Sequence, residues 1–245
     1  MREKRQGRRS AEDALKTRFT ILTVAADLFC EFGYAKVSLR QIGDKAGVSH
    51  SLLRHHFGSK EKIWHAISDG LHSYMSQYMK LILSHIPPET PANILLYRFT
   101  LRLLAHSLVN RKPIQLIADS VRQDDALFDY YIGTAGEIER VIEDLAAEYN
   151  QQFPDKSLNV WEVKWQLLMF AHSAASLTPF LKETWAEVTT DLNECLLHHL
   201  NLFNQTLVAK YHVDEANIEH PKSVQELVYD MKCDWADINP TKLEN

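Results

Sequence analysis

Residues 38–57, SLRQIGDKAGVSHSLLRHHF, hold the side chains of this chain whose types and spacing fit the reading of a nucleic acid. The pattern predicts two short helices joined by a tight turn, a helix-turn-helix, whose second helix enters the major groove of DNA. Positions 50, 51 and 54 share one face of that second helix, so their side chains would reach base edges together. The expected base contacts come from Ser49, His50, Ser51 and Arg54.

Arg54 is the strongest of these candidates because a guanidinium can bond both O6 and N7 of guanine. Its loss would then cost about 1–3 kcal/mol and relax specificity at one base pair. The alternative is a contact between Arg54 and a phosphate alone, in which case its loss would weaken binding to all sequences alike.

Phosphate contacts are expected from the start of the first helix of the motif. Ser38 can offer its hydroxyl and nearby backbone amides to a phosphate, and Arg40 adds positive charge on the same side. A solvated surface arginine is the alternative for Arg40. His55 and His56 are also assigned to the DNA contact rather than to a metal. Neighbouring residues on a helix point about 100° apart, and no carboxylate or cysteine joins them at ligand spacing.

The distribution of charge supports a nucleic-acid interface at one end of the chain. Residues 1–62 hold 13 Lys and Arg against 7 Asp and Glu, whereas residues 63–245 hold 14 against 25. The basic part coincides with the predicted helix-turn-helix, although the whole chain carries a net charge of −5. A basic N-terminal region of this kind is the electrostatic footprint of a DNA-binding segment.

Other function classes lack their sequence signals. No Gly-rich phosphate loop, metal cluster, nucleophile elbow or Glu-x-x-His pair occurs, so we set aside an enzyme and expect no cofactor. Cys30, Cys195 and Cys233 lie far apart without a CxxC pair, which disfavours a zinc site or a disulfide framework. The apolar stretch 19–30 contains Asp27 and no cleavage site, and no apolar run approaches a bilayer span. We therefore expect a cytoplasmic protein with no membrane partner.

The apolar periodicity and the cap signals predict an all-α chain. Gly33 should end the first helix, Ser38 and Gln41 form a capping box, Gly47 lies in the turn, and Ser49 caps the second helix of the motif. Leu52, Leu53 and Phe57 should fix that helix to the core. The expected helices span about 14–32, 38–46, 49–57, 59–85, 91–109, 114–122, 124–151, 160–181, 189–211 and 223–235, with caps at Thr90, Asn159 and Ser223.

The stretch ILTVAADLFCEFGYAKVSLRQIGDKAGVSHSLLRHHFGSKEKIW resembles the DNA-binding domain of TetR-type transcriptional regulators. The matching features are AADLFCEFGY, SLRQIGDKAGVS and L-x-x-HF-x-SKEKIW, and they cover roughly residues 15–65. The resemblance implies an all-helical homodimer with an N-terminal three-helix helix-turn-helix domain and a larger helical bundle domain that often binds a small molecule. It also implies that Lys60 contacts the DNA backbone, with a simple exposed charge as the alternative.

The chain departs from the family pattern on the recognition helix. The family commonly has a small residue or Thr where this chain has Leu52, and Tyr where it has Arg54 and His56. The family's Tyr often contacts a phosphate, so His56 is expected to do the same. The operator sequence is not carried over from any relative.

These observations predict four segments: a basic arm over 1–13, a helix-turn-helix domain over 14–62, a sensing and dimerisation domain over 63–212, and a tail over 213–245. The arm could follow the DNA backbone or enter the minor groove, attracted by counterion release, or remain a solvated tail.

Two long helices of the body, 160–181 and 189–211, carry stripes that could pair across a two-fold axis as a four-helix bundle. The stripes are Ala171, Ser173, Ala174, Ala175 and Ser176 on the first helix, and Leu192, Leu196, Leu200, Phe203 and Leu207 on the second. An internal core is the alternative for both stripes.

The middle of the chain holds aromatic and polar residues that suit a ligand pocket or an ordinary core. They are Tyr97, Phe99, Arg102, His106, Phe128, Tyr130, Tyr131, Trp165, Phe170 and His172. The function predicted from the sequence is a homodimeric repressor that a small-molecule effector releases from a palindromic operator in double-stranded DNA. The alternative is a DNA-binding regulator without such a ligand, controlled by a protein partner or constitutive.

Overall fold

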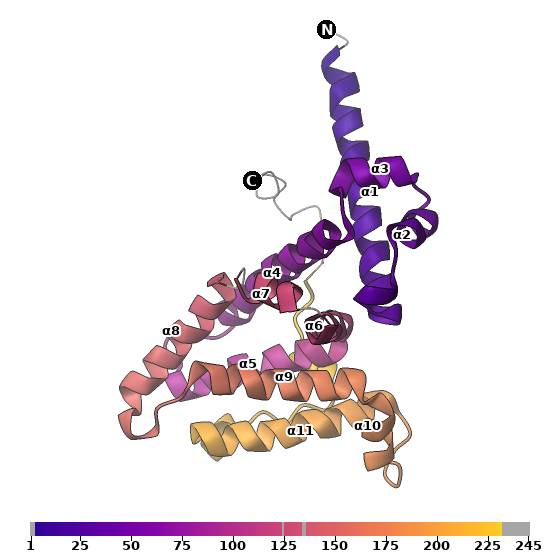
Figure 1. Cartoon of the computed structure of the whole chain (residues 1–245). Coiled ribbons are helices and arrows are strands. Elements are labelled where there is room, and N and C mark those ends of the chain that lie inside the picture. The colour runs from indigo at the N-terminus through magenta and orange to yellow at the C-terminus, as the bar shows by residue number, and fades with distance from the viewer. Residues whose placement is uncertain (1–2, 124, 134–135, 232–245) are drawn as a thin grey trace. The chain divides into compact units, whose positions relative to one another are not determined.

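The computed structural model describes residues 3–123, 125–133 and 136–231, and within these ranges the regular structure is entirely helical (Figure 1). The predicted all-α class is therefore confirmed. By their contacts the described residues form two compact units, an N-terminal unit (3–74 with 116–133) and a body unit (75–115 with 136–231). The division by function at residues 13, 62 and 212 stays a prediction.

The N-terminal unit contains α1 (Glu3–Phe32), α2 (Leu39–Ala46), α3 (His50–Phe57) and the first half of α4 (Lys60–Ser84), with the short turn η1 (Tyr34–Lys36) after α1. Gly33 has φ 82°, which ends α1 as predicted, and Gly47 joins α2 to α3 with φ 67°. These are left-handed values that glycine adopts without a Cβ penalty. The core of the three-helix motif is made by Ile21, Ala25, Phe29, Ile42, Leu53, Phe57 and Trp64, all buried.

Helix α1 begins at Glu3, so the expected start near residue 14 was wrong. The described part of the basic arm, residues 3–13, forms about three helical turns. Among the described side chains of α1 (residues 13–32), the buried core begins at Ile21.

The predicted helix over 124–151 was also wrong, because the structure has α7 (Asp125–Gly133) and α8 (Gly136–Gln152) there. Gly133 and Gly136 lie at the facing ends of these helices, and glycine is a poor helix former. Helix α7 belongs to the N-terminal unit together with most of α6 (Lys112–Gln123). The Tyr130 hydroxyl of α7 donates to the Asp69 carboxylate of α4 at 2.9 Å.

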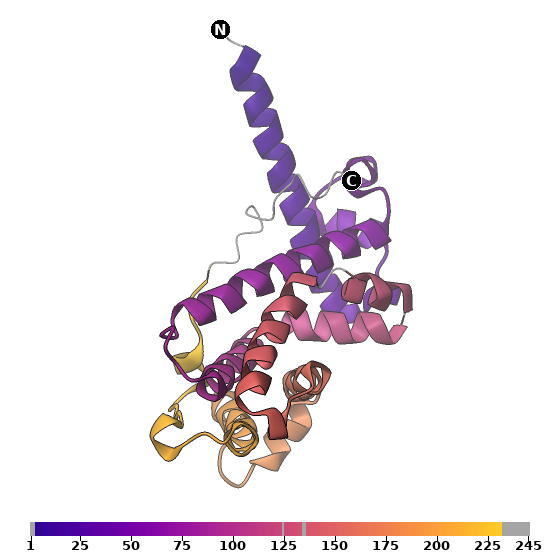
Figure 2. The same ribbon diagram turned by 90° about the vertical axis from the view of Figure 1, so that its left-hand side faces the viewer.

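The body unit is built around α5 (Ala92–Val109), which is buried at most of its positions. It packs against α8, α9 (Val160–Ser176) and α11 (Leu192–Tyr211), and Figure 2 shows α9 and α11 nearly end-on. The expected helix over 160–181 ends early because Pro179 starts a separate helix, α10 (Thr178–Thr184). A 3-10 turn, η2 (Pro154–Lys156), joins α8 to α9, and Asn159 caps α9 as predicted.

The stripes proposed for dimerisation lie mostly inside a single chain. Leu196, Leu200, Phe203 and Leu207 of α11 are at most 5% exposed, and Ala171, Ala174 and Ala175 of α9 at most 4%. The alternative interpretation, an internal core, is correct for these seven residues. The predicted cap at Thr90 was wrong as well, since Pro91 precedes α5 and makes no side-chain cap bond.

A segment without α-helix, which we call the C-terminal strap (residues 213–231), follows α11 and packs on α5 and α11. It contains two 3-10 turns, η3 (Glu215–Asn217) and η4 (Val224–Leu227). The predicted helix over 223–235 is therefore absent as far as residue 231, and residues 232–235 lie outside the described ranges. Glu226 accepts a hydrogen bond from the Lys222 backbone N–H at 2.8 Å rather than completing a capping box with Ser223.

None of the helices in the described ranges has the length and apolar character that crossing a bilayer requires.

Candidate nucleic-acid interface

Helix α3 presents one face to the core and the other to solvent. Leu53 is 0% and Phe57 5% exposed, and they anchor the inner face as predicted. Leu52 is 38% exposed, so its expected place in the core was wrong. His50, Ser51, Arg54 and His55 are all exposed, which leaves the outer face of α3 polar and basic.

The start of α3 is held by a side-chain cap. The Ser49 hydroxyl accepts a hydrogen bond from the Leu52 backbone N–H at 3.2 Å and lies 3.0 Å from the Ser51 hydroxyl. The predicted cap is confirmed, but capping uses part of the bonding capacity expected for a base contact. Arg54 and His50 are therefore stronger candidates for base contacts than Ser49 and Ser51.

The start of α2 is closed by the predicted capping box. The Ser38 hydroxyl accepts from the Gln41 backbone N–H at 3.3 Å, and the Ser38 backbone N–H donates to Gln41 Oε1 at 2.8 Å. The first backbone amides of α2 remain available for a phosphate, because the first turn of a helix leaves them without intrahelical partners. The Arg40 side chain is 88% exposed and lies 3.7 Å from Asp44, a surface pair that a phosphate could replace.

Lys60 and His56 lie closer to the core than expected. Lys60 Nζ donates to the Tyr34 carbonyl at 2.9 Å and sits 4.2 Å from the centre of the Tyr34 ring. Partial burial lowers the pKa of Lys60. Lys60 thus ties the start of α4 to η1, and its contact with DNA stays a prediction. Burial, followed by the charges of His55 and Arg18, lowers the pKa of His56, which favours its neutral form at pH 7.

A metal site has no donor set in this unit or in the rest of the described chain. The ring centres of His55 and His56 are 5.7 Å apart in an edge-on arrangement. No group of three or more His, Cys, Asp or Glu side chains in the described ranges comes close enough to hold an ion.

The helix-turn-helix is matched by a family model. The model described as "Bacterial regulatory proteins, tetR family" matches residues 21–67, which span the core of α1, α2, α3 and the start of α4.

Residues 21–67 of this chain thus form a helix-turn-helix of the TetR type.

Curated transcriptional regulators match part of this chain. The HTH-type transcriptional repressor Rv3405c of Mycobacterium tuberculosis is 34% identical over 97 residues, which is 38% of this chain and 47% of the relative. The HTH-type transcriptional regulator TtgR of Pseudomonas putida is 35% identical over 65 residues, 26% of this chain and 31% of the relative. The chain thus matches less than half the length of these relatives.

Solved structures extend the likeness of fold to the body unit. FadR from Bacillus subtilis, in complex with stearoyl-CoA, aligns with a TM-score of 0.59 at 13% identity over 79% of this chain and 97% of that one. A complex of SmeT with triclosan aligns with a TM-score of 0.59 at 18% identity over 85% of this chain and 97% of that one. At these identities the comparison shows a shared fold alone.

One residue that matters for this TetR-type domain gave no signal in the sequence. Arg18 of α1 donates from Nη1 to the His56 carbonyl at 3.1 Å, and its guanidinium lies 4.4 Å from the centre of the Phe57 ring. It therefore binds the C-terminal end of α3 to α1. Residues 18 and 56 are 38 positions apart, so no local pattern marks the contact.

Proposed function

We propose that this protein is a homodimeric transcriptional repressor of the TetR family that binds a palindromic operator and releases it when a small molecule binds the body unit. The observation that carries the proposal is the exposed basic face of α3, in a helix-turn-helix that matches the TetR family model. An α-helix with such a face fits the major groove of B-DNA.

The proposal gives the exposed residues separate roles. Arg54, with His50 and Ser51 beside it, reads base edges, while Arg40 and the amides at the start of α2 hold phosphates. The caps at Ser38 and Ser49 set the angle at which α2 and α3 meet the DNA. Phosphate contacts place the protein on the duplex, and the α3 side chains select the sequence.

A dimer is supported by an exposed apolar face on α9 and its neighbours. Trp161, Trp165, Leu168 and Met169 follow the spacing i, i+4, i+7 and i+8, which places them on one side of α9. They are 59%, 62%, 46% and 50% exposed. Phe180 of α10 and Leu202 of α11 are exposed as well, by 72% and 49%. An apolar face of this kind marks an interaction site, and a second copy of the chain would cover it across a two-fold axis.

A small-molecule effector is supported by the solved relatives in complex with stearoyl-CoA and with triclosan. The effector would act by binding one conformation of the body better than another. Its effect on operator binding can be no larger than that difference in affinity. Of the residues considered for a pocket, Tyr97, Phe99 and His106 are at most 3% exposed and form core, whereas Phe128 and Trp165 are largely exposed.

The test is a selection of random duplex DNA by the purified protein at physiological salt. We expect an enriched palindrome for the wild type and relaxed specificity at one position of each half-site for Arg54→Ala. Arg140→Ala serves as the matched control, because Arg140 is an exposed arginine of α8 in the body unit. Sequence-independent binding by the wild type would contradict the proposal.

The effector is tested separately by following the unfolding temperature against a panel of metabolites and lipophilic compounds. A ligand that binds the folded state raises this temperature, and we expect it also to release the selected operator. If no compound in a broad panel raises the unfolding temperature, a regulator controlled by a protein partner, or a constitutive one, would be favoured.

A further inference from the structure

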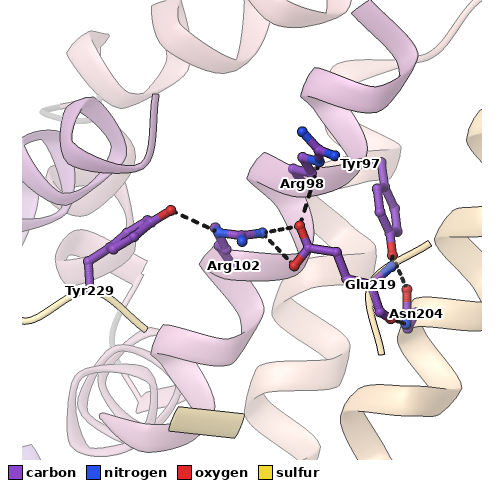
Figure 3. Close-up of polar contacts among 6 residues, drawn as sticks. All are labelled: Tyr97, Arg98, Arg102, Asn204, Glu219 and Tyr229. Carbon is purple, nitrogen blue, oxygen red and sulfur yellow. Dashed lines mark hydrogen bonds and ion pairs between the residues drawn. The ribbon is translucent and has the colours of Figure 1, made fainter. Parts of the chain in front are cut away.

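Two arginines of α5 converge on one carboxylate of the C-terminal strap (Figure 3). Arg102 Nη1 donates to both oxygens of Glu219, at 2.7 and 2.8 Å. Arg98, one turn earlier on α5, places its Nε 3.6 Å from Glu219 Oε1. The side chains are only 16% exposed for Arg102, 19% for Glu219 and 28% for Arg98, so the charges meet in a largely desolvated recess.

The recess is built from further polar groups that hold the main chain of Glu219. The Tyr97 hydroxyl accepts from the Glu219 backbone N–H at 2.8 Å and donates to Asn204 Oδ1 at 2.8 Å. Asn204 Nδ2 donates to the Glu219 carbonyl at 2.8 Å. Tyr97 and Asn204 are themselves buried. Glu219 is thus bound at its carboxylate, its N–H and its carbonyl, as a ligand is bound in a site.

The site holds more positive charge than its occupant neutralises. Two guanidinium groups face one carboxylate, and the Arg102 Nε donates instead to the neutral Tyr229 hydroxyl at 3.2 Å. The Nε of Arg98 is buried, and among the described contacts its distance to Glu219 is that of an ion pair rather than a hydrogen bond. A partly buried guanidinium whose Nε lacks a hydrogen bond favours an additional or better-placed anion.

Glu219 lies in the C-terminal strap, the part of the described body unit that follows α11, its last α-helix. The strap carries Glu219 together with the buried apolar side chains Val213, Val224 and Leu227. It can leave α5 without breaking a helical hydrogen bond, because its regular structure is limited to the two 3-10 turns. The strap places a carboxylate and apolar side chains against α5. A ligand that combines these two kinds of group would therefore fit the same surface.

We propose that Arg98 and Arg102 form a binding site for a small carboxylate joined to an apolar body, and that Glu219 occupies this site in the absence of the ligand. A ligand that displaces Glu219 also releases the strap. The strap also contacts α4 and the residue that follows it. The Tyr229 N–H donates to the Tyr78 hydroxyl at 3.2 Å, and the Tyr229 ring stacks on His85 with ring centres 4.1 Å apart. The proposed binding site does not depend on the proposed function, whereas an effect of its ligand on operator binding does.

The binding site is tested without DNA by chemical rescue of Glu219→Ala. Removal of the carboxylate leaves two partly buried arginines without this partner, which lowers the unfolding temperature. The probes are acetate, hexanoate and inorganic phosphate, at constant ionic strength. We expect hexanoate to restore about 3–6 °C of the lost unfolding temperature in a saturable manner, and acetate to restore less. The wild type should respond at least about tenfold more weakly, because Glu219 competes for the site.

Two matched variants make the rescue specific. Glu226→Ala removes another strap carboxylate, one bound to a backbone N–H rather than to arginine, and should respond to carboxylates no more strongly than the wild type. Glu219→Ala combined with Arg102→Met should lose the response as well. A response that survives in this double variant would overturn the proposed site, and so would the absence of any saturable effect in Glu219→Ala.

If Glu219→Ala does not fold, Glu219→Gln keeps the volume and part of the bonding, and hexanoate binding is measured on it by calorimetry. We expect at least about a tenfold gain in affinity over the wild type, and an equal affinity would overturn the proposal. Equal rescue by phosphate would also contradict it, because the site would then select charge and not a carboxylate. These outcomes do not depend on the DNA selection. The carboxylate site and the proposed repressor function can therefore be refuted independently of each other.

Discussion

At the scale of single residues, the exposed arginines of the helix-turn-helix differ in what they can do. Arg40 lies at the start of α2 and is paired only with the exposed Asp44. If Arg40 holds a phosphate, Arg40→Ala should weaken binding to every duplex alike and reduce the salt dependence, d log K/d log[salt], by about 1. Asp44→Asn should do the opposite and strengthen binding, since it frees Arg40. Fluorescence anisotropy at several salt concentrations measures both, and a change confined to one base position would contradict the phosphate role.

Arg18 is predicted to stabilise the domain rather than to read DNA. Arg18→Met removes the hydrogen bond to the His56 carbonyl and the cationic contact with the Phe57 ring. We expect a loss of about 1–3 kcal/mol in the free energy of unfolding of the unit. Urea denaturation measures it, with Arg40→Met as the control because that side chain is 88% exposed. Equal stability of the two variants would show that the contact contributes nothing.

Buried histidine should make the stability of the body unit depend on pH. His106 is 3% exposed and stacks on Tyr78, and burial lowers its pKa to about 4 from an ordinary value of 6.5. Below pH 6.5 the unfolded chain binds a proton that the folded chain refuses, so stability falls as the pH drops from 6.5 towards 4. The slope from this group reaches roughly 1 kcal/mol per pH unit, and it should disappear in His106→Gln. Denaturant unfolding between pH 4 and 7 gives the slopes, and identical slopes would contradict the assignment.

At the scale of elements, the structures that the sequence predicted well are those fixed by local chemistry. Ser38 with Gln41, Gly47 and Ser49 define the ends of α2 and α3 within a few residues, because caps and left-handed glycines act through neighbouring backbone groups. The apolar period continued across Gly133 and Gly136 and therefore suggested one helix where there are two. The pattern at Ser223 and Glu226 matched a capping box, yet packing of Val224 and Leu227 on α5 holds that segment as a 3-10 turn.

The helical extension of α1 provides a prediction about the basic arm. Lys4, Arg5, Arg8 and Arg9 all belong to this helical extension. Ser10→Pro keeps these charges but breaks the helix. If the helix carries them to DNA, this variant should bind a long duplex several-fold more weakly and a duplex trimmed to the operator unchanged, with Ser10→Ala as control. Unaltered binding of the long duplex would mean that a flexible basic tail suffices.

At the scale of the whole molecule, charge asymmetry and the family pattern led to a division by function that stays a prediction, whereas long-range contacts did not follow from either. The net positive charge of residues 1–62 and the excess of acidic residues beyond them point to DNA binding at one end of the chain. The contact between Arg102 and Glu219 joins residues 117 positions apart. No periodicity or cap signal reports such a pair, so the strap had no role that the sequence could supply.

The sequence pattern also failed to separate core residues from the dimer interface. One substitution tests where that interface lies. The leucines of α11 looked like an interface but are core, while the exposed tryptophans of α9 were considered only for a pocket. Trp165→Glu places a charge in the middle of the exposed apolar face, where burial against a second copy would leave it without a partner. We expect the variant to become monomeric in analytical ultracentrifugation at concentrations where the wild type is dimeric.

The monomer should still fold, because Trp165 is 62% exposed and contributes little to the core. It should bind an isolated half-site like the wild type but lose at least about tenfold in affinity for the full palindrome, since the second recognition helix is no longer linked to the first. Phe128→Glu is the control, being an exposed aromatic residue of α7 in the N-terminal unit. A Trp165→Glu protein that remains dimeric would move the interface away from α9, and one that is monomeric yet binds the palindrome at full strength would separate operator recognition from dimerisation.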